Sequence, residues 1–441
     1  MLITPSLKKL CALFPCPLYV VGGAVRDFIM GSTVSDVDLS AGLTATEVIE
    51  LLKDTEFIVK PHSLKLGTLG IKVGSESYEY TAFRVDSYGS DGSHAPQEVK
   101  FTSSVEQDAL RRDFTVNALY YDIATGKILD FLGGLDDIKN KIIRTVRKPE
   151  LVIKEDALRI LRMVRFSAKL GYDIEAETLK VAKERVSSLK TIAVERIREE
   201  FNQILIADTY NGVKDAQIRG LELLMEIGAM DYIVPELVSA VGVKQNPRYH
   251  VYDVWRHLLE SVRCVRPKIR LVALLHDVAK PICQNKSGSM RGHNVVGAQM
   301  ARHIMSRLTY SKAETERTAR LVEAHMFDLK GTETDEAVRL FVLNNRDIVL
   351  DLIDLKNADY TAHGMNEGEN PSAVRLRDTY NKMLSSNVAF NVKELPIDGE
   401  DLIALGVAPQ ERSVKLNTAL EHFAQKGVYP TREEALEYIK Q

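Results

Sequence analysis

The sequence predicts an α+β protein in which a mixed-sheet N-terminal domain precedes a long, entirely helical remainder. Strand-like apolar runs alternate with turn residues over residues 1–145, which is typical of a small mixed α/β domain. From residue 146 onward, apolar residues recur at helical spacing and strand signals nearly vanish. Because 441 residues are too many for a single hydrophobic core, we expect several domains.

Composition places the chain among ordinary globular proteins. Hydrophobic residues make up 45% and charged residues 27%, which excludes a disordered or fibrous protein. No apolar run is long enough for a membrane span, and Pro15 and Pro17 interrupt the one stretch that resembles a signal peptide. Four cysteines without a Cys-x-x-Cys pair favour a reduced protein. We therefore expect a cytoplasmic protein with no membrane partner.

The first functional signal is a predicted strand, turn and helix. Apolar residues 18–21 predict a buried strand, and Gly22-Gly23 predict a sharp turn that lets the backbone approach a phosphate. A helix is expected over 24–30, and its N-terminal N–H groups would face the same place. This corner is suited to bind a phosphate group.

Two aspartates follow that corner. After a break at 31–32 we expect a second strand over 34–39. Side chains repeat every two residues along a strand, so Asp36 and Asp38 would point to the same face. Alone, an Asp-x-Asp is more often a solvated turn. Next to a phosphate-binding turn, however, paired carboxylates can hold Mg²⁺ and position a nucleotide triphosphate against an attacking hydroxyl.

Together, these features resemble the first motif of the class II tRNA nucleotidyltransferase and bacterial poly(A) polymerase family. The resemblance implies that Asp36 and Asp38 are catalytic metal ligands for nucleotidyl transfer, with Mg²⁺ as the cofactor. It also implies a head similar to that of polymerase beta, followed by a helical neck, body, HD domain and tail. Nucleotide contacts are implied for the turn and the helix after it, at Gly22, Gly23, Arg26 and Asp27.

Glu79 is an isolated acid in the strand-like run 77–83. It could simply point to solvent, as on any half-exposed sheet. The resemblance instead implies a third catalytic carboxylate, beside Asp36 and Asp38 on a neighbouring strand. There it would help to align or activate the primer 3′ hydroxyl for in-line attack on the α-phosphate.

Residues 106–118 carry a second strong resemblance to the same family. Adjacent Arg111 and Arg112 offer forked donors to a triphosphate, and Asp113 can accept hydrogen bonds from ribose hydroxyls. An apolar, strand-like run follows them, so we expect these charged side chains at the beginning of that run. In the family this motif reads the ribose and holds the triphosphate, and the resemblance adds Asn117 to the nucleotide contacts.

A possible base-reading pair lies at the expected start of a helix. Asp156 and Arg159 are three residues apart, hence on one helical face, and could simply form an intrahelical ion pair. Aspartate only accepts and arginine only donates, however, so one such pair can read both cytosine and adenine. Guanine and uracil present the reversed pattern and would be mismatched.

This pair resembles the amino-acid template with which the family selects CTP and ATP. In that interpretation Glu155 orients Arg159, four residues away. Two further arginines on the same helix are expected to contact the nucleotide, Arg162 and Arg165.

Histidines concentrate in the middle of the chain, with six of the ten between residues 250 and 325. A buried His-Asp pair such as His276-Asp277 needs a compensating charge, and imidazoles with carboxylates suit a divalent metal. The ordered set resembles the HD phosphohydrolase superfamily, and His293 and His325 would extend its site or touch phosphate. The resemblance implies four ligands for a divalent metal: His257, His276, Asp277 and Asp359.

The resemblance covers essentially the whole chain and implies a division into four parts. These are a nucleotidyltransferase head (1–145), a helical neck and RNA-binding region (146–240), an HD metal-binding domain (241–365) and a helical tail that contacts tRNA (366–441). The net charge is only −3, but a basic run over 139–169 would suit an RNA backbone. The leading function implied is addition of CCA to tRNA 3′ ends from CTP and ATP.

Other functions stay open on the sequence alone. A bacterial poly(A) polymerase shares the motifs, although its typical Arg-rich, Phe-containing segment is absent after His62. Enzymes that add only A or only CC also share them. The CC-adding ones typically lack the flexible loop expected here over 86–97, in which Ser93-His94-Ala95-Pro96 replaces the usual arginines before the proline. From another class, a metal-dependent HD phosphohydrolase could act on RNA ends or nucleotides, with an N-terminal half that merely binds RNA.

Overall fold

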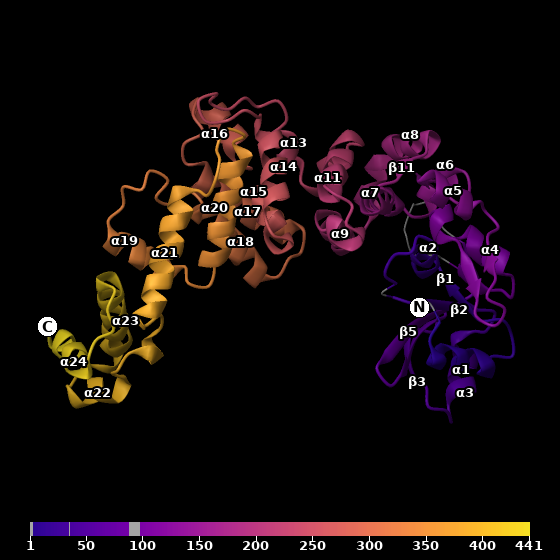
Figure 1. Cartoon of the computed structure of the whole chain (residues 1–441), viewed down its shortest axis with the longest axis horizontal. Coiled ribbons are helices and arrows are strands. Elements are labelled where there is room, and N and C mark those ends of the chain that lie inside the picture. Colours follow the sequence, from indigo (N-terminus) through magenta and orange to yellow (C-terminus); the bar gives the residue numbers. More distant parts are fainter. Residues whose placement is uncertain (1–2, 35, 88–97) are drawn as a thin grey trace. The chain divides into compact units, whose positions relative to one another are not determined.

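The computed structural model describes residues 3–34, 36–87 and 98–441, which divide into two compact units, Met1–Pro235 and Glu236–Gln441 (Figure 1). All strands lie in the first unit, and the described residues of the second are helical or irregular. The predicted α+β class, with a mixed sheet first and helices after it, is confirmed. The finer division into head, neck, HD domain and tail stays a prediction.

A seven-stranded mixed sheet organises the first unit. Its order is β3-β4-β5-β2-β1-β8-β9. Strands β2 and β5 run parallel, and the other neighbouring strands are antiparallel. The strands are β1 (Tyr19–Val21), β2 (Asp38–Ala41), β3 (Ile58–Ser63), β4 (Thr68–Val73), β5 (Glu76–Ala82), β8 (Tyr120–Asp122) and β9 (Ile128–Leu129). Every residue of β1, which lies between β2 and β8, is buried, as its apolar sequence predicts.

Two small strand pairs lie outside this sheet. Strands β6 (Arg84–Ser87) and β7 (Glu98–Phe101) form an antiparallel pair, and β10 (Ile142–Ile143) and β11 (Asp173–Ile174) form a parallel one. The flexible loop expected over 86–97 therefore begins within β6. Its residues 88–97, with Ser93-His94-Ala95-Pro96, lie outside the described residues.

The strand that carries the Asp-x-Asp is shorter than predicted. The expected range is 34–39, but β2 begins only at Asp38, and residues 36 and 37 precede it without regular structure. Asp36 and Asp38 therefore do not alternate along one strand. Aspartate bonds readily to nearby backbone and is depleted in strands, which accounts for the late start.

The helices of the first unit cover the sheet and then continue the chain. They are α1 (Pro5–Leu13), α2 (Gly23–Ile29), α3 (Ala45–Leu52), α4 (Val105–Leu110), α5 (Gly134–Asn140), α6 (Pro149–Glu155), α7 (Arg159–Leu170), α8 (Ala176–Arg185), α9 (Val194–Leu205), α10 (Asp208–Asn211), α11 (Ala216–Glu226) and α12 (Met230–Ile233); α13 (Pro235–Val238) spans the boundary. Helix α7 packs its apolar face against α9 and α11. Its other face is therefore available to line a cavity.

The helix expected through Asp156 is interrupted. Helix α6 ends at Glu155, and Asp156 is extended, with φ −148°. Its Oδ1 accepts a hydrogen bond from the Leu158 backbone N at 3.0 Å, so the side chain competes with the helical pattern. The prediction that Asp156 and Arg159 share one helical face is therefore wrong, because the two residues flank a turn between helices.

The second unit is built of helices joined by loops. They are α14 (Val254–Cys264), α15 (Arg270–Leu275), α16 (Lys280–Ser287), α17 (His293–Arg307), α18 (Lys312–Ala324), α19 (Asp335–Asn344), α20 (Val349–Ala362), α21 (Pro371–Ser385), α22 (Gly399–Ala404), α23 (Pro409–Lys426) and α24 (Arg432–Lys440). Contacts link α14, α15, α17, α18 and α20. His257 lies on α14 and His293 on α17, whereas His276 and His325 follow the ends of α15 and α18. Over the described residues, no helix has the length and apolar character that crossing a bilayer requires.

Candidate active site

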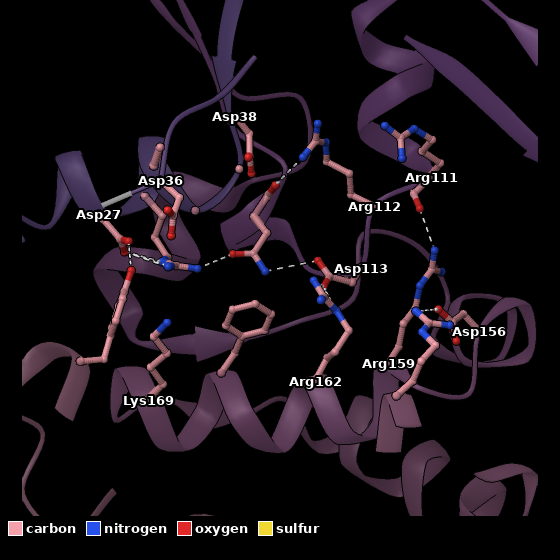
Figure 2. A pocket seen from close by; sticks show the side chains of 18 residues that line it. Asp27, Asp36, Asp38, Arg111, Arg112, Asp113, Asp156, Arg159, Arg162 and Lys169 are labelled. Carbon is pink, nitrogen blue, oxygen red and sulfur yellow. Dashed lines mark hydrogen bonds and ion pairs between the residues drawn. The ribbon is translucent and has the colours of Figure 1, made fainter. Parts of the chain in front are cut away.

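A cavity of about 420 Å³ opens in the first unit beside the glycine turn and helix α7 (Figure 2). All but two of the residues predicted for the first site, Glu79 and Arg165, line it. The lining residues are Gly22, Gly23, Ala24, Arg26, Asp27, Asp36, Asp38, Arg111, Arg112, Asp113, Asn117, Asp156, Arg159, Arg162, Phe166, Lys169, Arg196 and Tyr210. Residues from separate sequence segments thus meet at one place.

The carboxylates of the predicted metal site crowd one another. The parallel register of β2 and β5 pairs Asp38 directly with Glu79. Withdrawal from bulk water raises the pKa of Asp38 to about 6. The positive charge of Arg112 opposes this shift, and the negative charges of Glu79 and Asp36 add to it. A divalent cation would relieve this repulsion, and oxygen ligands are those that Mg²⁺ prefers. The donor set therefore fits Mg²⁺.

The glycine turn is held by neighbouring side chains. Gly22 adopts φ +71°, and a Cβ there would come within 3.3 Å of Arg112 Nη1. Buried Arg26 donates through Nε to Asp27 Oδ1 at 2.9 Å and through Nη1 to Asn117. The Tyr210 hydroxyl also donates to Asp27. Arg26 and Asp27 thus fix the start of α2, in addition to lining the cavity.

Asp108, which the sequence did not single out, organises the two adjacent arginines. It is fully buried and accepts hydrogen bonds from Arg111 Nε at 2.7 Å and Arg112 Nη2 at 3.2 Å. The Tyr120 hydroxyl donates to it at 2.6 Å. Burial opposes ionisation, but the arginines outweigh it and lower the pKa of Asp108. Its spacing of three and four residues from the arginines was the available signal.

Asp113 accepts from protein donors. Its Oδ1 accepts from Asn117 Nδ2 at 3.2 Å, and its Oδ2 accepts from Arg162 Nε at 2.8 Å. Burial raises the pKa of Asp113, but the Arg162 guanidinium more than compensates and lowers it to about 2. A ribose hydroxyl would therefore share or replace one of these partners.

The candidate base-reading pair meets at the cavity despite the turn between its members. Arg159 donates through Nη1 to Glu155 Oε2 at 3.1 Å, which is the contact expected from their spacing, and through Nη2 to the Arg111 backbone O at 2.7 Å. Asp156 Oδ2 lies 3.8 Å from Arg196 Nη2 on α9. Both members are thus oriented by other protein groups.

Helix α7 supplies cavity residues that the predicted site omitted. Phe166 lies four residues after Arg162, and Lys169 lies three residues after Phe166, so all three share one helical face. This periodicity could have identified both residues. Lys169 Nζ lies 3.1 Å from the ring centroid of Tyr210. Burial lowers the pKa of Lys169 to about 8, and the positive charge of Arg165 contributes to the same shift.

Tyr210 was not predicted for the site but lines the cavity, whereas Arg165 was predicted but does not line it. Tyr210 comes from α10, and no sequence spacing connects it to the rest of the site. Arg165 is absent from the lining because its Nε donates to Glu200 Oε2 on α9 at 2.6 Å. It lies against the ring of Phe166, at 4.3 Å from the centroid, and so supports α7 from beside the cavity.

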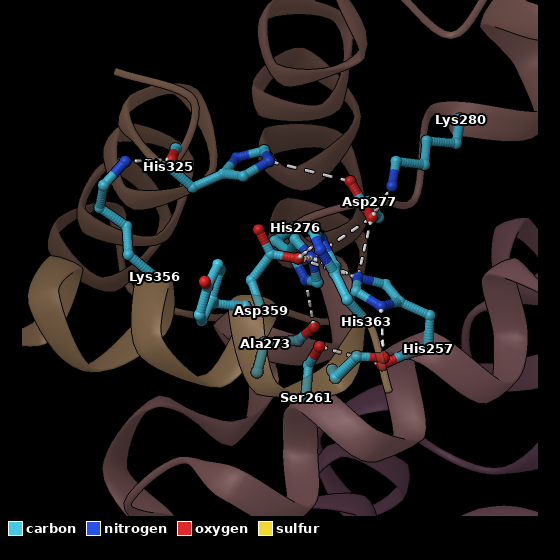
Figure 3. A network of polar contacts seen from close by, with 12 residues as sticks. His257, Ser261, Ala273, His276, Asp277, Lys280, His325, Lys356, Asp359 and His363 are labelled. Carbon is cyan, nitrogen blue, oxygen red and sulfur yellow. Dashed lines mark hydrogen bonds and ion pairs between the residues drawn. The ribbon is translucent and has the colours of Figure 1, made fainter. Parts of the chain in front are cut away.

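The second unit brings its four predicted metal ligands together (Figure 3). His257 Nε2 lies 3.0 Å from Asp359 Oδ1 and 3.2 Å from Asp277 Oδ2. His276 Nε2 lies 3.3 Å from the same Asp277 oxygen. Burial opposes ionisation of Asp277, but Lys280 and the histidines hold its pKa well below the usual range. Two imidazoles and two carboxylates converging within 4.8 Å fit a divalent ion.

Three stretches of the chain match known family models. Residues 18–144 match the poly A polymerase head domain, and residues 171–241 match the probable RNA and SrmB-binding site of polymerase A. Residues 248–364 match the HD domain. The first match contains the Asp-x-Asp and the adjacent arginines, and the last contains the four convergent ligands.

Two curated relatives show how far the similarity extends. The chain is 36% identical over 252 residues to the CCA-adding enzyme of Leuconostoc mesenteroides. The aligned segment covers 56% of this chain and 59% of that enzyme. The chain thus matches less than two thirds of that relative's length. It is 28% identical to the A-adding tRNA nucleotidyltransferase of Deinococcus radiodurans over 452 residues, which covers 97% of this chain and 96% of the relative.

A solved structure shares the fold along nearly the full chain. The CCA-adding enzyme of Bacillus stearothermophilus in complex with CTP aligns with a TM-score of 0.68 at 22% identity. The alignment covers 99% of this chain and 98% of the other.

Proposed function

Because this chain belongs to the tRNA nucleotidyltransferase and poly(A) polymerase family and carries an HD domain, we propose that it adds CCA to the 3′ ends of tRNA from CTP and ATP. One observation carries the proposal. A single cavity is lined both by Asp36 and Asp38, which we propose bind the metal, and by Asp156 and Arg159, which we propose read the base. Nucleotidyl transfer and selection of the base can therefore take place on one bound nucleotide.

The chain's own groups would bind and orient the reactants. Asp36 and Asp38 would hold the Mg²⁺ ions, with Glu79 beside Asp38 on the next strand. When bound, the ions supply charge neutralisation for the triphosphate and the attacking hydroxyl. Arg111 and Arg112, fixed by Asp108, would bind the triphosphate.

Base selection would rest on a pre-oriented guanidinium. Arginine has five N–H donors, and the contacts of Arg159 with Val152 O, Glu155 Oε2 and Arg111 O use three of them. The remaining edge would donate to cytosine N3 or adenine N1, while Asp156 accepts from the exocyclic amine. Guanine and uracil would place a donor against Arg159, which leaves polar groups unpaired.

The test uses tRNA transcripts that end at the discriminator base, at −C and at −CC, each incubated with one labelled nucleotide at a time. We expect C on the first two transcripts and A on the third. Incorporation of A alone would instead assign an A-adding activity, like that of the Deinococcus relative. Long A tails would identify a poly(A) polymerase, and C without A would identify a CC-adding enzyme. Each of these three outcomes would contradict CCA addition.

The HD domain supports a second candidate activity in the same chain. We propose a divalent metal at His257, His276, Asp277 and Asp359 that serves hydrolysis of phosphate esters on RNA ends or nucleotides. The observation that favours it is the convergence of four buried donor residues, two of which, Asp277 and Asp359, also line a cavity of about 950 Å³. His276→Ala should abolish this hydrolysis while CCA addition persists.

We place both activities in the cytoplasm. The four cysteines of the sequence form no Cys-x-x-Cys pair, which is consistent with a reducing compartment. The partners would be tRNA, CTP and ATP.

A further inference from the structure

The sheet of the first unit has one buried face and one open face over strands β3, β4 and β5. Along β5, Tyr78 and Tyr80 are buried, whereas Glu79 between them is exposed. Along β4, Leu69 and Ile71 are buried in the same alternating pattern. Side chains alternate between the two faces of a strand. Glu79 therefore belongs to the open face.

Strand pairing places this open face beside the proposed metal site. Glu79 is paired with Asp38 on β2 in one direction and with Gly70 on β4 in the other. Gly70 is in turn paired with Lys60 on β3. Directly paired residues share a face, so two carboxylates, a glycine and a lysine form one row across four strands. Neighbouring strands lie about 4.8 Å apart, so Gly70 is one strand from Glu79 and two strands from Asp38.

The imidazole of His62 lies over Gly70 on the open face. A Cβ at Gly70 would come within 3.2 Å of His62 Nε2 and 3.3 Å of its Cε1, so the ring occupies the space of the missing side chain. The register of β3 shifts between Pro61 and Ser63, which makes His62 the extra residue of a β-bulge. Strand β3 is at the edge of the sheet, where bulges and prolines are most frequent. The bulge re-aims His62 across β4, in the direction of β5.

We propose that this open face binds the 3′-terminal nucleotide of the RNA that is extended, and that His62 stacks on its base. The proposal rests on the nucleotidyl transfer proposed above and adds the site of the second substrate. Within it, Glu79 would lie next to the terminal 3′ hydroxyl, and Gly70 would leave room for the His62 ring to lie flat.

The position of the nucleotide cavity leaves this side for the attacking strand. Asp38 lines the cavity together with the turn after β1 and helix α7, and among the described residues none of the lining comes from β3, β4 or β5. The incoming nucleotide would therefore lie on the β1 side of Asp38. In-line attack brings the hydroxyl to the α-phosphate from the side opposite the leaving pyrophosphate. Glu79 is the next residue of the row on that opposite side.

The chemistry of the open face suits an RNA end whose base varies. Histidine rings stack on unpaired bases, and stacking tolerates any base because each has a π-face. This tolerance is required if the same site receives the discriminator base, then C, then CC. Lys60 and Lys72 are exposed on this face and would pair with phosphates of the preceding nucleotides.

A purely structural role for His62 is the competing explanation. An aromatic ring across a strand glycine can stabilise a sheet without any ligand. His62→Ala would then lower the urea midpoint of the first unit and leave the affinity for RNA unchanged. Affinity for RNA therefore separates the two explanations.

The test measures binding of the full chain to a tRNA transcript that ends at the discriminator base, by fluorescence anisotropy without added nucleotide. A matched transcript carries an abasic 3′-terminal nucleotide. His62→Ala should raise Kd for the complete transcript by roughly 5–50-fold, as expected for the loss of one stacked base. It should not change Kd for the abasic transcript, and His62→Phe should restore tight binding. Equal affinity of wild type and His62→Ala for the complete transcript would overturn the proposal.

Gly70 supplies a second variant that acts through the same ring. Gly70→Ala should weaken binding of the complete transcript, because the new Cβ displaces the His62 imidazole. Once His62 is replaced by alanine, the remaining close atom is Lys60 O at 3.9 Å, which is ordinary contact. Gly70→Ala should therefore add nothing to His62→Ala. Additive losses would contradict a site formed jointly by His62 and Gly70.

Lysine variants separate contacts with phosphates from contacts with the base. Lys60→Ala should weaken both transcripts alike, because it removes a phosphate contact. Lys53→Ala is the matched control, since Lys53 is exposed at the end of α3. Tyr80 on the buried face donates to Leu43 O just before α3, which places that helix on the buried side of the sheet. Lys53→Ala should bind as wild type, and a loss equal to that of Lys60→Ala would contradict the assigned face.

Nucleotide incorporation reports separately on the proposed transferase. In His62→Ala, KM for the RNA should rise while KM for CTP stays at the wild-type value, and a rise in KM for CTP alone would contradict the proposal. A wild type that incorporates no nucleotide would refute the transferase function instead. The binding comparison of complete and abasic transcripts needs no turnover, so the two failures are distinguishable.

Discussion

Asp38 lies in register with Glu79 on the neighbouring parallel strand, so the strand pairing brings together two carboxylates that are 41 residues apart in sequence. Asp36 belongs to the irregular segment before β2 and lines the same cavity as Asp38. The site therefore depends on the pairing of β2 with β5 more than on alternation along one strand.

The first prediction concerns these carboxylates. Asp38→Asn should lower nucleotide incorporation by roughly 10²-fold or more, because a metal-bound charge contributes several kcal/mol to catalysis. Glu79→Gln should have a smaller effect, since Glu79 does not line the cavity. Single-turnover incorporation of C measures both. Glu98→Gln on β7 is an exposed control that should behave as wild type; wild-type rates for Asp38→Asn would refute the metal assignment.

A second prediction concerns stability and its dependence on pH. Asp113→Asn should destabilise the first unit by about 1–3 kcal/mol at pH 7, because it removes a charged hydrogen-bond acceptor from Arg162. The pKa of Asp113 in the folded protein is about 2, below the usual value for aspartate. The ionised group therefore stabilises the fold above about pH 4, and this contribution is lost as the pH falls towards 2.

Urea denaturation of wild type and Asp113→Asn at several pH values checks this. The difference between the two midpoints should be constant from pH 7 to 5 and should shrink below about pH 4. A difference that grows as the pH falls would contradict the ion pair with Arg162.

Local motifs and the family resemblance that they carry were enough to predict most of the residues that meet at the first site, but not the backbone that carries them. The spacing of Asp156 and Arg159 predicted a shared helical face, whereas the Asp156 side chain bonds to Leu158 N and ends the helical pattern. The two residues still meet at the cavity because the interruption is short. Local hydrogen bonding by aspartate overrode the apolar periodicity around it.

Long-range contacts could not be predicted in this way. Tyr210 donates its hydroxyl hydrogen to Asp27, 183 residues away, and nothing near Tyr210 in sequence marks it as part of a site. In the second unit, by contrast, the resemblance of the ordered histidines and aspartates to the HD phosphohydrolase superfamily implied four ligands, and the structure brings those four residues together. Buried histidine and aspartate need a compensating partner, which is the physical reason that such an ordered set is informative.

A third prediction concerns base selection. Arg159→Lys should reduce incorporation of C and A roughly 10–100-fold, because an ammonium cannot reproduce the oriented guanidinium, and hydrogen bonds of charged groups contribute about 1.5–3 kcal/mol. Preference over UTP and GTP should fall in parallel. Glu155→Gln should produce a milder loss, since Val152 O and Arg111 O still accept from Arg159.

Competition assays with all four nucleotides measure this selectivity. Arg165→Lys is the matched control on the same helix, because Arg165 faces Glu200 and is not part of the cavity lining. If Arg165→Lys changed base preference as strongly as Arg159→Lys, the template assignment would be wrong.

The last prediction concerns Lys169, whose pKa is lowered to about 8 by burial and by Arg165 and Arg26. The side chain is charged below that pH and neutral above it. Because Lys169 lines the nucleotide cavity, KM for CTP should rise several-fold between pH 7 and pH 9, corresponding to about 1 kcal/mol of charge interaction. Lys169→Arg should remove this rise, since arginine stays protonated, and Lys169→Met should raise KM at both pH values alike. A wild-type rise that survives in Lys169→Met would assign the titration to another group.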